Sequence, residues 1–598
     1  MAEENKEALS YTPTQKETEV VNRVWTRFNR MKDERDKPRH EFDGKTITEY
    51  VNYSMDAYNG IVSAELKATK EDWQSLIWDH ETRGKLKTIV SNVVGSRPFM
   101  SLIGETEADH SYAADMLEVF DDSWKKENGA YKLYEQTLST ACKGTVIVEE
   151  MYVEETVKRK EIISVDQETG AVKFEEKTVI RNGAGSVQSR IFPLLQFYPN
   201  ENSAEIKHDC CTLELFTEDK FREKYGNYPK AKYITPGTFI SGTDLDAIYY
   251  KSVGDRRNNL IEVLKYFNED VDELVILANG FWINAQSGEQ ISPIPFDHKR
   301  LPFSKSVFEL ADEECFYGKS FPDLLSGEQQ TRNALLRLMV DQEVLSINKP
   351  ILLGMGTELE SYEIYPGKTI KMTGDISQMK EMEMSGSSQS AMQLLQMLKG
   401  SSDVNTSISP TAQGVGSGRK TAREAVILDE NAKKISGTFM INIYKLLFDR
   451  ANLRIPNIQQ FYTTPIHLSV LKDKYGKDAL DSNNKKIPAG KQFRKIPVVK
   501  PGKEPVWISM RPEMKGIKLN ITLVEDFEVS QNRSFRIEMS KSMLDEAKVN
   551  PLINADNSTI DYLEALGKNP DKYYIKPDQN AKDFQENKGL PPVNNTQQ

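Results

Sequence analysis

Hydrophobic positions in the middle of the chain recur at helical spacing. A first helix is predicted after Ser326, which with Gln329 fits a capping box that satisfies free backbone amides. Pro350 is expected to stop this helix, giving a length of roughly 30–35 Å at the usual rise per residue. The helix has an apolar stripe, and four charged residues lie outside it: Arg332, Arg337, Asp341 and Glu343. The stripe consists of Leu335, Leu338, Met339 and Leu345, with Gln342 in line.

Residues 349–385 have a different character from the helix before them. β-Branched and aromatic residues are broken by Gly354, Gly356 and the Pro366-Gly367 pair, which predicts a small insert with strands. A second helix is predicted over 386–399, because Gly400 is a typical helix stop. The two helices are therefore predicted to flank a small compact insert, with the chain running outward along the first helix and back along the second.

Residues 400–419 are predicted to be a loop. About half of 400–418 is Gly or Ser, which gives high backbone freedom and little to bury. Thr421 and Glu424 fit a second capping box, which opens a long helix over 420–455. This helix needs a long partner surface, in a neighbouring helix or subunit or within its own domain. Its near-heptad stripe consists of Ala425, Leu428, Ala432, Ile435, Phe439 and Leu446.

The N-terminal half changes from helical to strand patterns. Residues 1–40 form a charged amphipathic arm that either docks on a neighbouring subunit or nucleic acid, or is a frayed helix. Residues 46–142 are predicted to be mainly helical, and strand patterns begin at Thr145. The stretch 259–284 predicts consecutive strands with a turn at Asn279-Gly280.

The C-terminal part predicts a strand and two short helices. Residues 516–524 alternate strictly between apolar and polar positions, as a half-buried strand does. Helices are predicted over 533–548 and 558–566. The tail 568–598 has too little apolar content to fold, so disorder is expected there.

Composition indicates a globular chain and excludes several classes of protein. The 598 residues suffice for about two to four domain-sized units. No apolar run is long enough to span a membrane, and the charged first residues do not resemble a signal peptide. Four cysteines and six histidines match no zinc or disulfide pattern, so we expect no metal and no cofactor. The net charge of −11 disfavours tight DNA binding but allows DNA to slide past.

Catalytic motifs are missing from the sequence. Gly-Lys followed by Ser or Thr occurs at 44–46, 318–320 and 367–369, but a phosphate-binding loop needs a Gly five residues earlier. Those earlier positions hold Arg39, Glu313 and Tyr362. In GVGSGRKT (414–421), Arg separates Gly from Lys and no strand precedes. With no nucleophile elbow or Cys/His pair either, the chain is predicted not to be an enzyme.

The order of these elements resembles the portal proteins of tailed bacteriophages. The resemblance is carried by RNALLRLMVDQEVLSINKPILLG (332–354), YPGKTIKM (365–372) and GSGRKTAREAVILDENAKKISGTF (416–439), and by RFNRMKDERDKPR (27–39) near the start. It covers about residues 20–566 and rests on architecture rather than on an invariant signature.

The resemblance implies an α+β fold with a mixed α/β wing, a two-helix stem, a clip insert, a tunnel loop, a long wing helix and a helical crown. The expected division is 1–40 N-terminal arm, 41–320 wing, 321–348 first stem helix, 349–385 clip, 386–399 second stem helix, 400–419 tunnel loop, 420–455 long wing helix, 456–532 wing strands and loops, 533–567 crown and 568–598 tail.

The same resemblance implies a ring, most often of twelve subunits, at one vertex of the virion capsid, assembled in the host cytoplasm. Double-stranded DNA would pass through its channel, and the terminase motor and then head-completion or tail proteins would dock on the clip; major capsid and scaffolding proteins are further expected partners. The expected channel residues are Lys399, Asn405, Thr406, Ser407, Arg419 and Lys420. The expected docking residues are Lys349, Glu358, Glu360, Tyr362 and Lys368. An oligomeric helical scaffold or adaptor that never touches DNA is the main alternative, and a terminase-type ATPase or nuclease is a weaker one.

Overall fold

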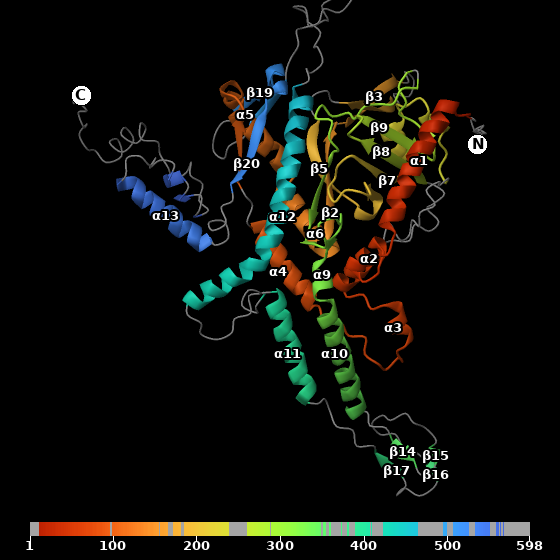
Figure 1. Cartoon of the computed structure of the whole chain (residues 1–598), viewed down its shortest axis with the longest axis vertical. Helices are drawn as coiled ribbons and strands as arrows, with labels where there is room; N and C mark the ends of the chain where they lie inside the picture. The colour runs from red at the N-terminus through yellow and green to blue at the C-terminus, as the bar shows by residue number, and fades with distance from the viewer. Residues whose placement is uncertain are drawn as a thin grey trace, which may run out of the picture.

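The computed structural model combines a mixed α/β body with two helices that project from it (Figure 1). It describes residues 11–95, 99–154, 156–165, 172–180, 185–237, 260–287, 289–347, 351–353, 358–359, 372–373, 379–381, 389–406, 408, 422–463, 494–498, 506–524, 533–549, 558–560, 562–563 and 566. The predicted mixture of helices and strands is confirmed, and every strand pair in the described ranges that the structure defines is antiparallel. The predicted tail lies outside these residues.

The N-terminal helix packs on the chain's own sheet. Helix α1 (Gln15–Arg35) begins with a capping box in which the Thr14 side chain accepts from the Glu17 amide. Its apolar face, which includes Val24 and Phe28, is fully buried against one face of a five-stranded sheet. Of the two predictions for residues 1–40, the amphipathic helix is present over Gln15–Arg35, but it is capped rather than frayed, and its apolar stripe belongs to the body's core.

The five-stranded sheet has the order β10-β9-β8-β7-β6. Asn279 and Gly280 both have positive φ, 45° and 82°, and join β9 to β10. This confirms the predicted turn, because a two-residue hairpin loop with two positive φ angles matches the twist of its strands. The strands are β6 (Phe197–Pro199), β7 (Asp209–Thr217), β8 (Leu260–Asn268), β9 (Glu273–Ala278) and β10 (Phe281–Trp282).

A helical layer precedes the strands, as predicted. Helix α6 ends at Gly144, whose φ of 79° and close approach to the Gly318 carbonyl leave no room for a side chain. The helices are α2 (Ile47–Asn59), α3 (Ala64–Ala68), α4 (Glu81–Gly95), α5 (Glu107–Lys126), α6 (Gly129–Lys143) and, further along the chain, α7 (Glu218–Tyr225) and α9 (Phe321–Leu324). One strand in this region escaped prediction: β1 (Phe99–Gly104) pairs with β20 (Leu519–Val524), the strand predicted over 516–524.

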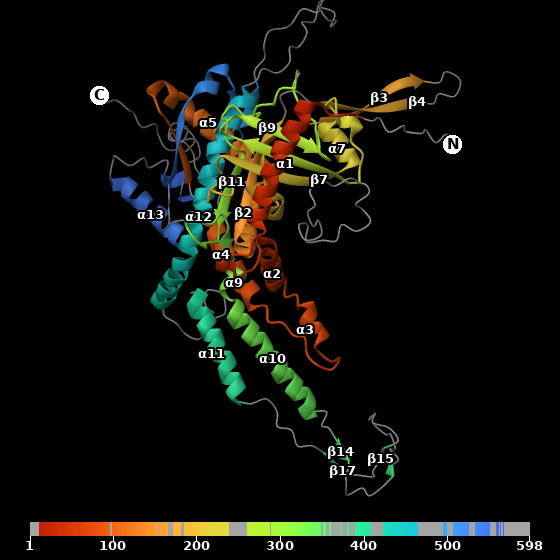
Figure 2. The same ribbon diagram turned by 45° about the vertical axis from the view of Figure 1, so that its right-hand side comes forward.

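The remaining strands form small antiparallel groups. A three-stranded sheet has the order β11-β2-β5, and a long hairpin of β3 and β4 extends from the body (Figure 2). The strands are β2 (Thr145–Val153), β3 (Thr156–Val165), β4 (Val172–Ile180), β5 (Ser186–Phe192), β11 (Phe303–Val307), β12 (Glu309–Leu310), β13 (Gly318–Lys319), β18 (Lys495–Val498) and β19 (Val506–Ser509).

The long helix α12 (Ala422–Tyr462) crosses the body and is longer than predicted. Phe439 and Leu446 of its predicted stripe are buried. The helix passes through Pro456 instead of ending at 455. Proline removes a backbone donor, but the helix stays packed beyond it. Ile458 is fully buried, and the Tyr462 hydroxyl accepts a hydrogen bond from the Val187 amide at 3.1 Å.

Four buried charges fix α12 to the body. Arg450 donates to Glu150 at 2.7 Å and lies 3.4 Å from Glu127, and Arg454 pairs with Glu127 at 2.5 Å. All four side chains are at most 2% exposed. Near the C-terminus, α13 (Arg533–Val549) confirms one predicted helix, and residues 558–560 and 562–563 are helical as predicted.

Candidate functional site: the projecting helix pair

Helices α10 (Ser326–Ile347) and α11 (Gln389–Thr406) project side by side from the body, and we call them the helix pair (Figures 1 and 2). Beyond their free ends lie two short strand pairs, which confirm that the predicted insert contains strands. These are β14 (Ile351–Leu353) with β17 (Met379–Glu381), and β15 (Glu358–Leu359) with β16 (Met372–Thr373).

The start of α10 differs from the prediction. The predicted capping box does not form, because Ser326 follows almost directly on α9, which is capped by the Ser320 hydroxyl. Gln329 instead donates to the Asp79 carbonyl at 2.7 Å and accepts from Thr82 at 2.7 Å. Helix α10 ends at Ile347, shortly before Pro350 as expected.

The burial of α10 is the reverse of an ordinary amphipathic helix. Its buried side chains are all polar or charged: Gln329, Arg332, Asn333, Arg337 and Asp341. By contrast, Leu338 of the predicted apolar stripe is 62% exposed, and Val340 and Ile347 are also exposed. Leu335, Met339 and Leu345 of that stripe are half-buried, and the face that packs on the body is the polar and charged one.

The charged face of α10 contacts residues 61–80, which include α3 and which we call the strap. Asp341 accepts from the Ser75 amide at 2.6 Å and pairs with Lys70 at 3.2 Å. Arg337 donates to the Ile77 carbonyl at 3.0 Å, and Asn333 accepts from the Asp79 amide at 2.9 Å. Side chains of α10 thus satisfy backbone groups of a segment with little regular structure of its own.

A second polar cluster, the clasp, joins both helices to the start of α4; it consists of Glu81, Lys85, Arg332, Ser402 and Asp403. The Lys85 amine is fully buried and contacts Ser402 at 2.6 Å, Asp403 at 2.8 Å and Glu81 at 3.0 Å. Burial lowers the pKa of Lys85, and its hydrogen bond with Asp403 opposes that change. Arg332 pairs with Glu81 and donates to the Leu398 carbonyl at 3.3 Å.

The clasp explains why the predicted end of the second helix is wrong. Helix α11 continues through Gly400, whose position is open to solvent, to Thr406. Ser402 and Asp403 bind Lys85, and Asn405 donates to Glu328 of α10 at 2.6 Å. These tertiary contacts outweigh the modest helix penalty of one glycine, about 1 kcal/mol.

Because α11 is longer than predicted, two of the predicted channel residues lie in a helix instead of a loop. Asn405 and Thr406 lie in the last turn of α11 rather than in a loop, and Thr406 is buried and donates to the Ser402 carbonyl. Lys399 is exposed on α11. Ser407, Arg419 and Lys420 lie outside the described residues.

Of the predicted docking residues, the structure describes the backbone of one. Glu358 lies in β15, opposite Thr373. Lys349, Glu360, Tyr362 and Lys368 lie outside the described residues. The structure therefore places Glu358 beyond the ends of the helix pair and leaves the other docking predictions as they stood.

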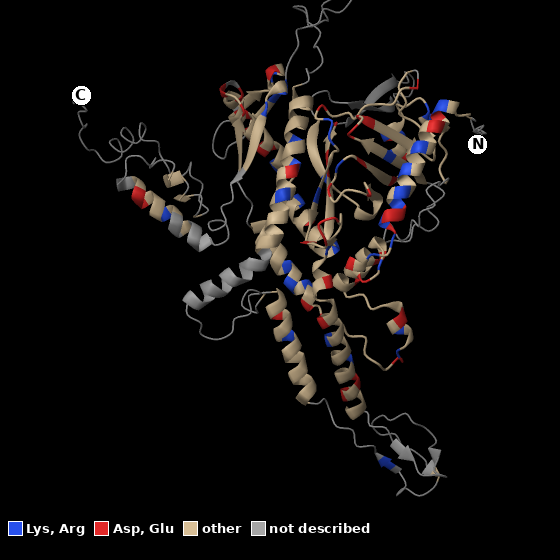
Figure 3. Cartoon of the chain, viewed as in Figure 1, with Lys and Arg blue, Asp and Glu red and all other residues tan. Residues whose placement is uncertain are grey.

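Charged residues are sparse along α11 and more frequent along α10 (Figure 3). On α11, Met397 is 67% and Val404 76% exposed, and Met392 and Leu394 are also exposed. Lys399 and Asp403 are the two charged residues between 389 and 406. Large, contiguous apolar surfaces mark interaction sites, whereas scattered exposed residues do not.

Sequence reasoning missed Lys85 and the role of Arg332 and Asp341 in holding the helices. A signal was present: the polar residues at 329, 333, 337 and 341 recur every four residues, as a packed helix face does. Their partners, however, come from segments about 250 residues earlier, which no local pattern identifies.

The structure offers no sign of a metal centre in its described ranges, where no group of three metal-ligating residues forms. The four cysteines are buried and unpaired. Among the described helices none combines the length and apolar character needed to cross a membrane. Comparison with protein-family models gives no match, and comparison with curated proteins gives none either.

Proposed function

We propose that this chain is the subunit of a viral portal, a ring at one capsid vertex through which double-stranded DNA is packaged and ejected. The observation that carries the proposal is the inverted burial of the helix pair. Its charged face is used within the subunit, and its apolar face is left for a partner. By the resemblance in sequence, that partner is a further copy of the same chain.

The two flanks of the helix pair differ, which favours head-to-tail assembly. In both views the strap lies on the side of α10 away from α11 (Figures 1 and 2). The strap presents Trp73, Leu76 and Ile77 to solvent, and α11 presents Met397 and Val404. When one surface binds a different surface of the next copy, the contact repeats and closes into a ring if the rotation allows.

The energy available in this contact is sufficient for assembly. Burying one exposed leucine, methionine or isoleucine side chain contributes about 1.5–3 kcal/mol. Several such residues on each flank therefore offset the cost of association, which runs to about 4–15 kcal/mol. A monomer would leave all of them in water.

Under this proposal the helix pair is the stem, the strand pairs at its end are the clip, and 409–419 is what remains of the tunnel loop. The terminase motor, and later head-completion or tail proteins, would dock on the clip. The sparse charge along α11 suits a wall past which a polyanion moves, because strong ion pairs with phosphate would retain it. No catalytic step is assigned to the chain.

Assembly is tested by measuring the mass of the purified chain with analytical ultracentrifugation. Leu338→Asp is expected to convert a large ring into monomers, since it places a charge in the proposed contact. The matched control is Leu310→Asp, because Leu310 is 64% exposed on the body and Leu338 is 62% exposed on α10. A wild-type chain that stays monomeric, or a Leu338→Asp ring of unchanged mass, would overturn the proposal.

The exposed apolar faces also favour a second candidate, a self-assembling scaffold or adaptor that never meets DNA. DNA passage separates the two candidates. Deleting 409–418, which spares the clasp, should leave rings intact and impair packaging or retention of DNA. Normal packaging by such rings would remove this loop from the mechanism.

A further inference from the structure

A cavity of about 430 Å³ lies between the strap, α2 and the first half of α10. Its walls come from residues within 53–57, 61–66, 78–82 and 322–337. The strap lies beside α10 in both views (Figures 1 and 2). The volume falls in the range of pockets that bind small molecules, about 300–1,000 Å³.

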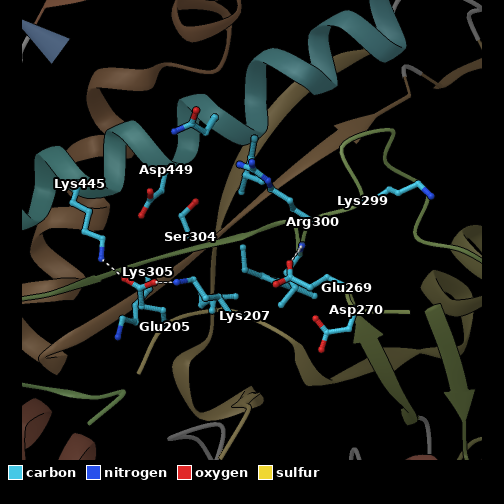
Figure 4. Close-up of a pocket in the computed structure, with 15 residues that line it drawn as sticks. Glu205, Lys207, Glu269, Asp270, Lys299, Arg300, Ser304, Lys305, Lys445 and Asp449 are labelled. Carbon is cyan, nitrogen blue, oxygen red and sulfur yellow. Dashed lines mark hydrogen bonds and ion pairs between the residues drawn. The ribbon is translucent and has the colours of Figure 1, made fainter. Parts of the chain in front are cut away.

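A larger cavity of about 540 Å³ beside α12 is a weaker candidate for a ligand site. Five cationic and four acidic side chains line it, and several of them pair with one another. Glu205, for example, pairs with Lys207 at 2.6 Å and with Lys445 at 2.9 Å (Figure 4). Because charges of both signs share this wall, it favours no particular class of ligand.

The cavity beside α10 differs because it contains a buried cation without a counter-ion. Arg337 is 7% exposed, and its Nε donates to the Ile77 carbonyl at 3.0 Å. Within the described part of the chain no carboxylate pairs with it, and Asp341, one turn further along α10, pairs with Lys70 instead. Burial lowers the pKa of Arg337, since desolvation penalises the charged form. An anion supplied from outside would offset this penalty.

One nitrogen of this guanidinium is within reach of a ligand. Arg337 Nη2 and Asn333 Nδ2 are buried without hydrogen-bond partners. Nη1 of Arg337 also lacks a partner among the residues that the structure describes, but it is not buried. The Trp78 ring lies 6.0 Å from the guanidinium carbon, and it packs so closely on Gly60 that a Cβ there would come within 3.0 Å of it. This end of the cavity therefore offers a charged donor beside a fixed aromatic ring.

The rest of the cavity wall is largely apolar. Asp56 on α2 and Arg337 are the two charged residues among those that line it. Because a single cation balances a single negative charge, the wall favours a monoanion with an apolar body. The apolar part of the wall consists of Tyr53, Ala57, Ile61, Val62, Leu66 and Pro322.

We propose that this cavity binds a small monocarboxylic acid whose apolar part fills the space between α2 and the strap. The carboxylate accepts a charge-assisted hydrogen bond from Nη1 of Arg337. The apolar part contacts Ile61, Val62 and Leu66. Because the strap is held to α10 by hydrogen bonds and ion pairs, the ligand adds an apolar contact at the base of the helix pair.

The first experiment is calorimetric titration of the intact chain with sodium octanoate, octan-1-ol and sodium acetate. Octanoate should bind at least about tenfold more tightly than octanol, which has the same apolar chain but no charge. Acetate has the charge but almost no apolar part, and should bind at least about a hundredfold more weakly than octanoate. No binding of octanoate, or equal affinities for octanoate and octanol, would overturn the proposal.

Octanedioate tests the preference for a monoanion. It has the length of octanoate and a second carboxylate, which would lie among apolar side chains. It should therefore bind at least about tenfold more weakly than octanoate. Equal affinities for the two acids would show that the apolar part does not occupy the cavity, and would contradict the proposal.

Two cations near the cavity provide a matched pair of variants. Arg337→Gln should remove the preference for octanoate over octanol while octanol still binds, which shows that the cavity is intact. Lys67 is exposed on α3, and Lys67→Gln should change the preference by less than about twofold. If Arg337→Gln kept the preference, or weakened both ligands equally, Arg337 would have no specific role toward a carboxylate and the proposal would fail.

Hydrogen exchange locates the bound acid. Saturating octanoate should slow amide exchange in 61–80, because the ligand joins the strap to its neighbours. Unchanged exchange in this segment would overturn the assignment of the site. Neither the titrations nor the exchange measurement depends on DNA or on ring formation, so this inference stands or fails apart from the proposed function.

Discussion

The body and the helix pair place the same kinds of side chain on opposite sides of the fold. In the body, apolar side chains such as Phe197 and Leu213 fill the core, and its buried charges occur in compact networks. In the helix pair, the buried side chains of α10 and α11 are polar, and several large apolar ones, such as Leu338 and Met397, are exposed. The body buries its large apolar side chains within one subunit, whereas those of the helix pair would be covered only in the proposed assembly.

The largest effect is expected in the buried charge network of the body. Arg454→Met should lower the free energy of unfolding by about 3–5 kcal/mol, because Glu127 would keep a buried charge with one fewer partner. Denaturant unfolding measures this loss. Arg511→Met, at an exposed position, is the control and should change stability by less than about 0.5 kcal/mol. If Arg454→Met also changed the free energy of unfolding by less than about 0.5 kcal/mol, the network would not be what holds α12 in place.

Two leucines, one in the body and one in the helix pair, test the difference in burial between these two regions. Leu213 is 1% exposed in the body, and Leu213→Ala should cost about 2–5 kcal/mol. Leu338→Ala on α10 should cost less than about 0.5 kcal/mol in the dissociated chain, although it removes the same atoms. Both are measured by urea unfolding under conditions that keep the chain monomeric. Similar losses at the two sites would mean that the outer face of α10 is packed within the subunit.

Acid should weaken the body through Glu214. Burial alone would raise the pKa of this carboxyl, but Lys265 at 3.0 Å and Arg190 at 2.8 Å lower it to about 2. Its contribution is complete above the unfolded pKa of 4.5 and is lost as pH falls toward 2. Between pH 4.5 and 3 the loss is about 2 kcal/mol. Glu214→Gln should flatten this part of the stability–pH curve, and a curve identical to wild type would contradict the assignment.

The smallest effect is expected at the clasp. Lys85→Met leaves Glu81 and Asp403 without their shared cation and should cost about 1–3 kcal/mol. The cost should be local, so hydrogen exchange in 389–406 should accelerate while the five-stranded sheet stays protected. Lys87→Met, exposed on the same helix, is the control. Unchanged exchange in α11 would remove Lys85 from the attachment of the helix pair.

Sequence patterns predicted much of this fold where local chemistry decides the structure. The Asn279-Gly280 turn, the alternating strand before Val524 and the buried Phe439 follow from turn geometry and periodicity. Predictions failed where distant contacts decide the outcome. Gly400 does not end α11 because Lys85 holds the next turn, and Pro456 does not end α12 because the residues beyond it are buried.

In the helix pair, too, local features could be predicted from the sequence and long-range contacts could not. The sequence separated the two faces of α10, because 3.6-residue periodicity is a local property. It gave no indication of which face would be buried, because that depends on the strap and on α4. The long-range partners of Arg332, Asn333 and Asp341 make the charged face the inner one.

The most direct test of the central claim is single-particle electron microscopy of the purified chain. The account predicts a closed ring with a central hole, in which α10 and α11 of neighbouring copies pack through their apolar faces around the axis. A monomer, or an assembly that leaves Leu338 and Met397 in solvent at its periphery, would contradict it.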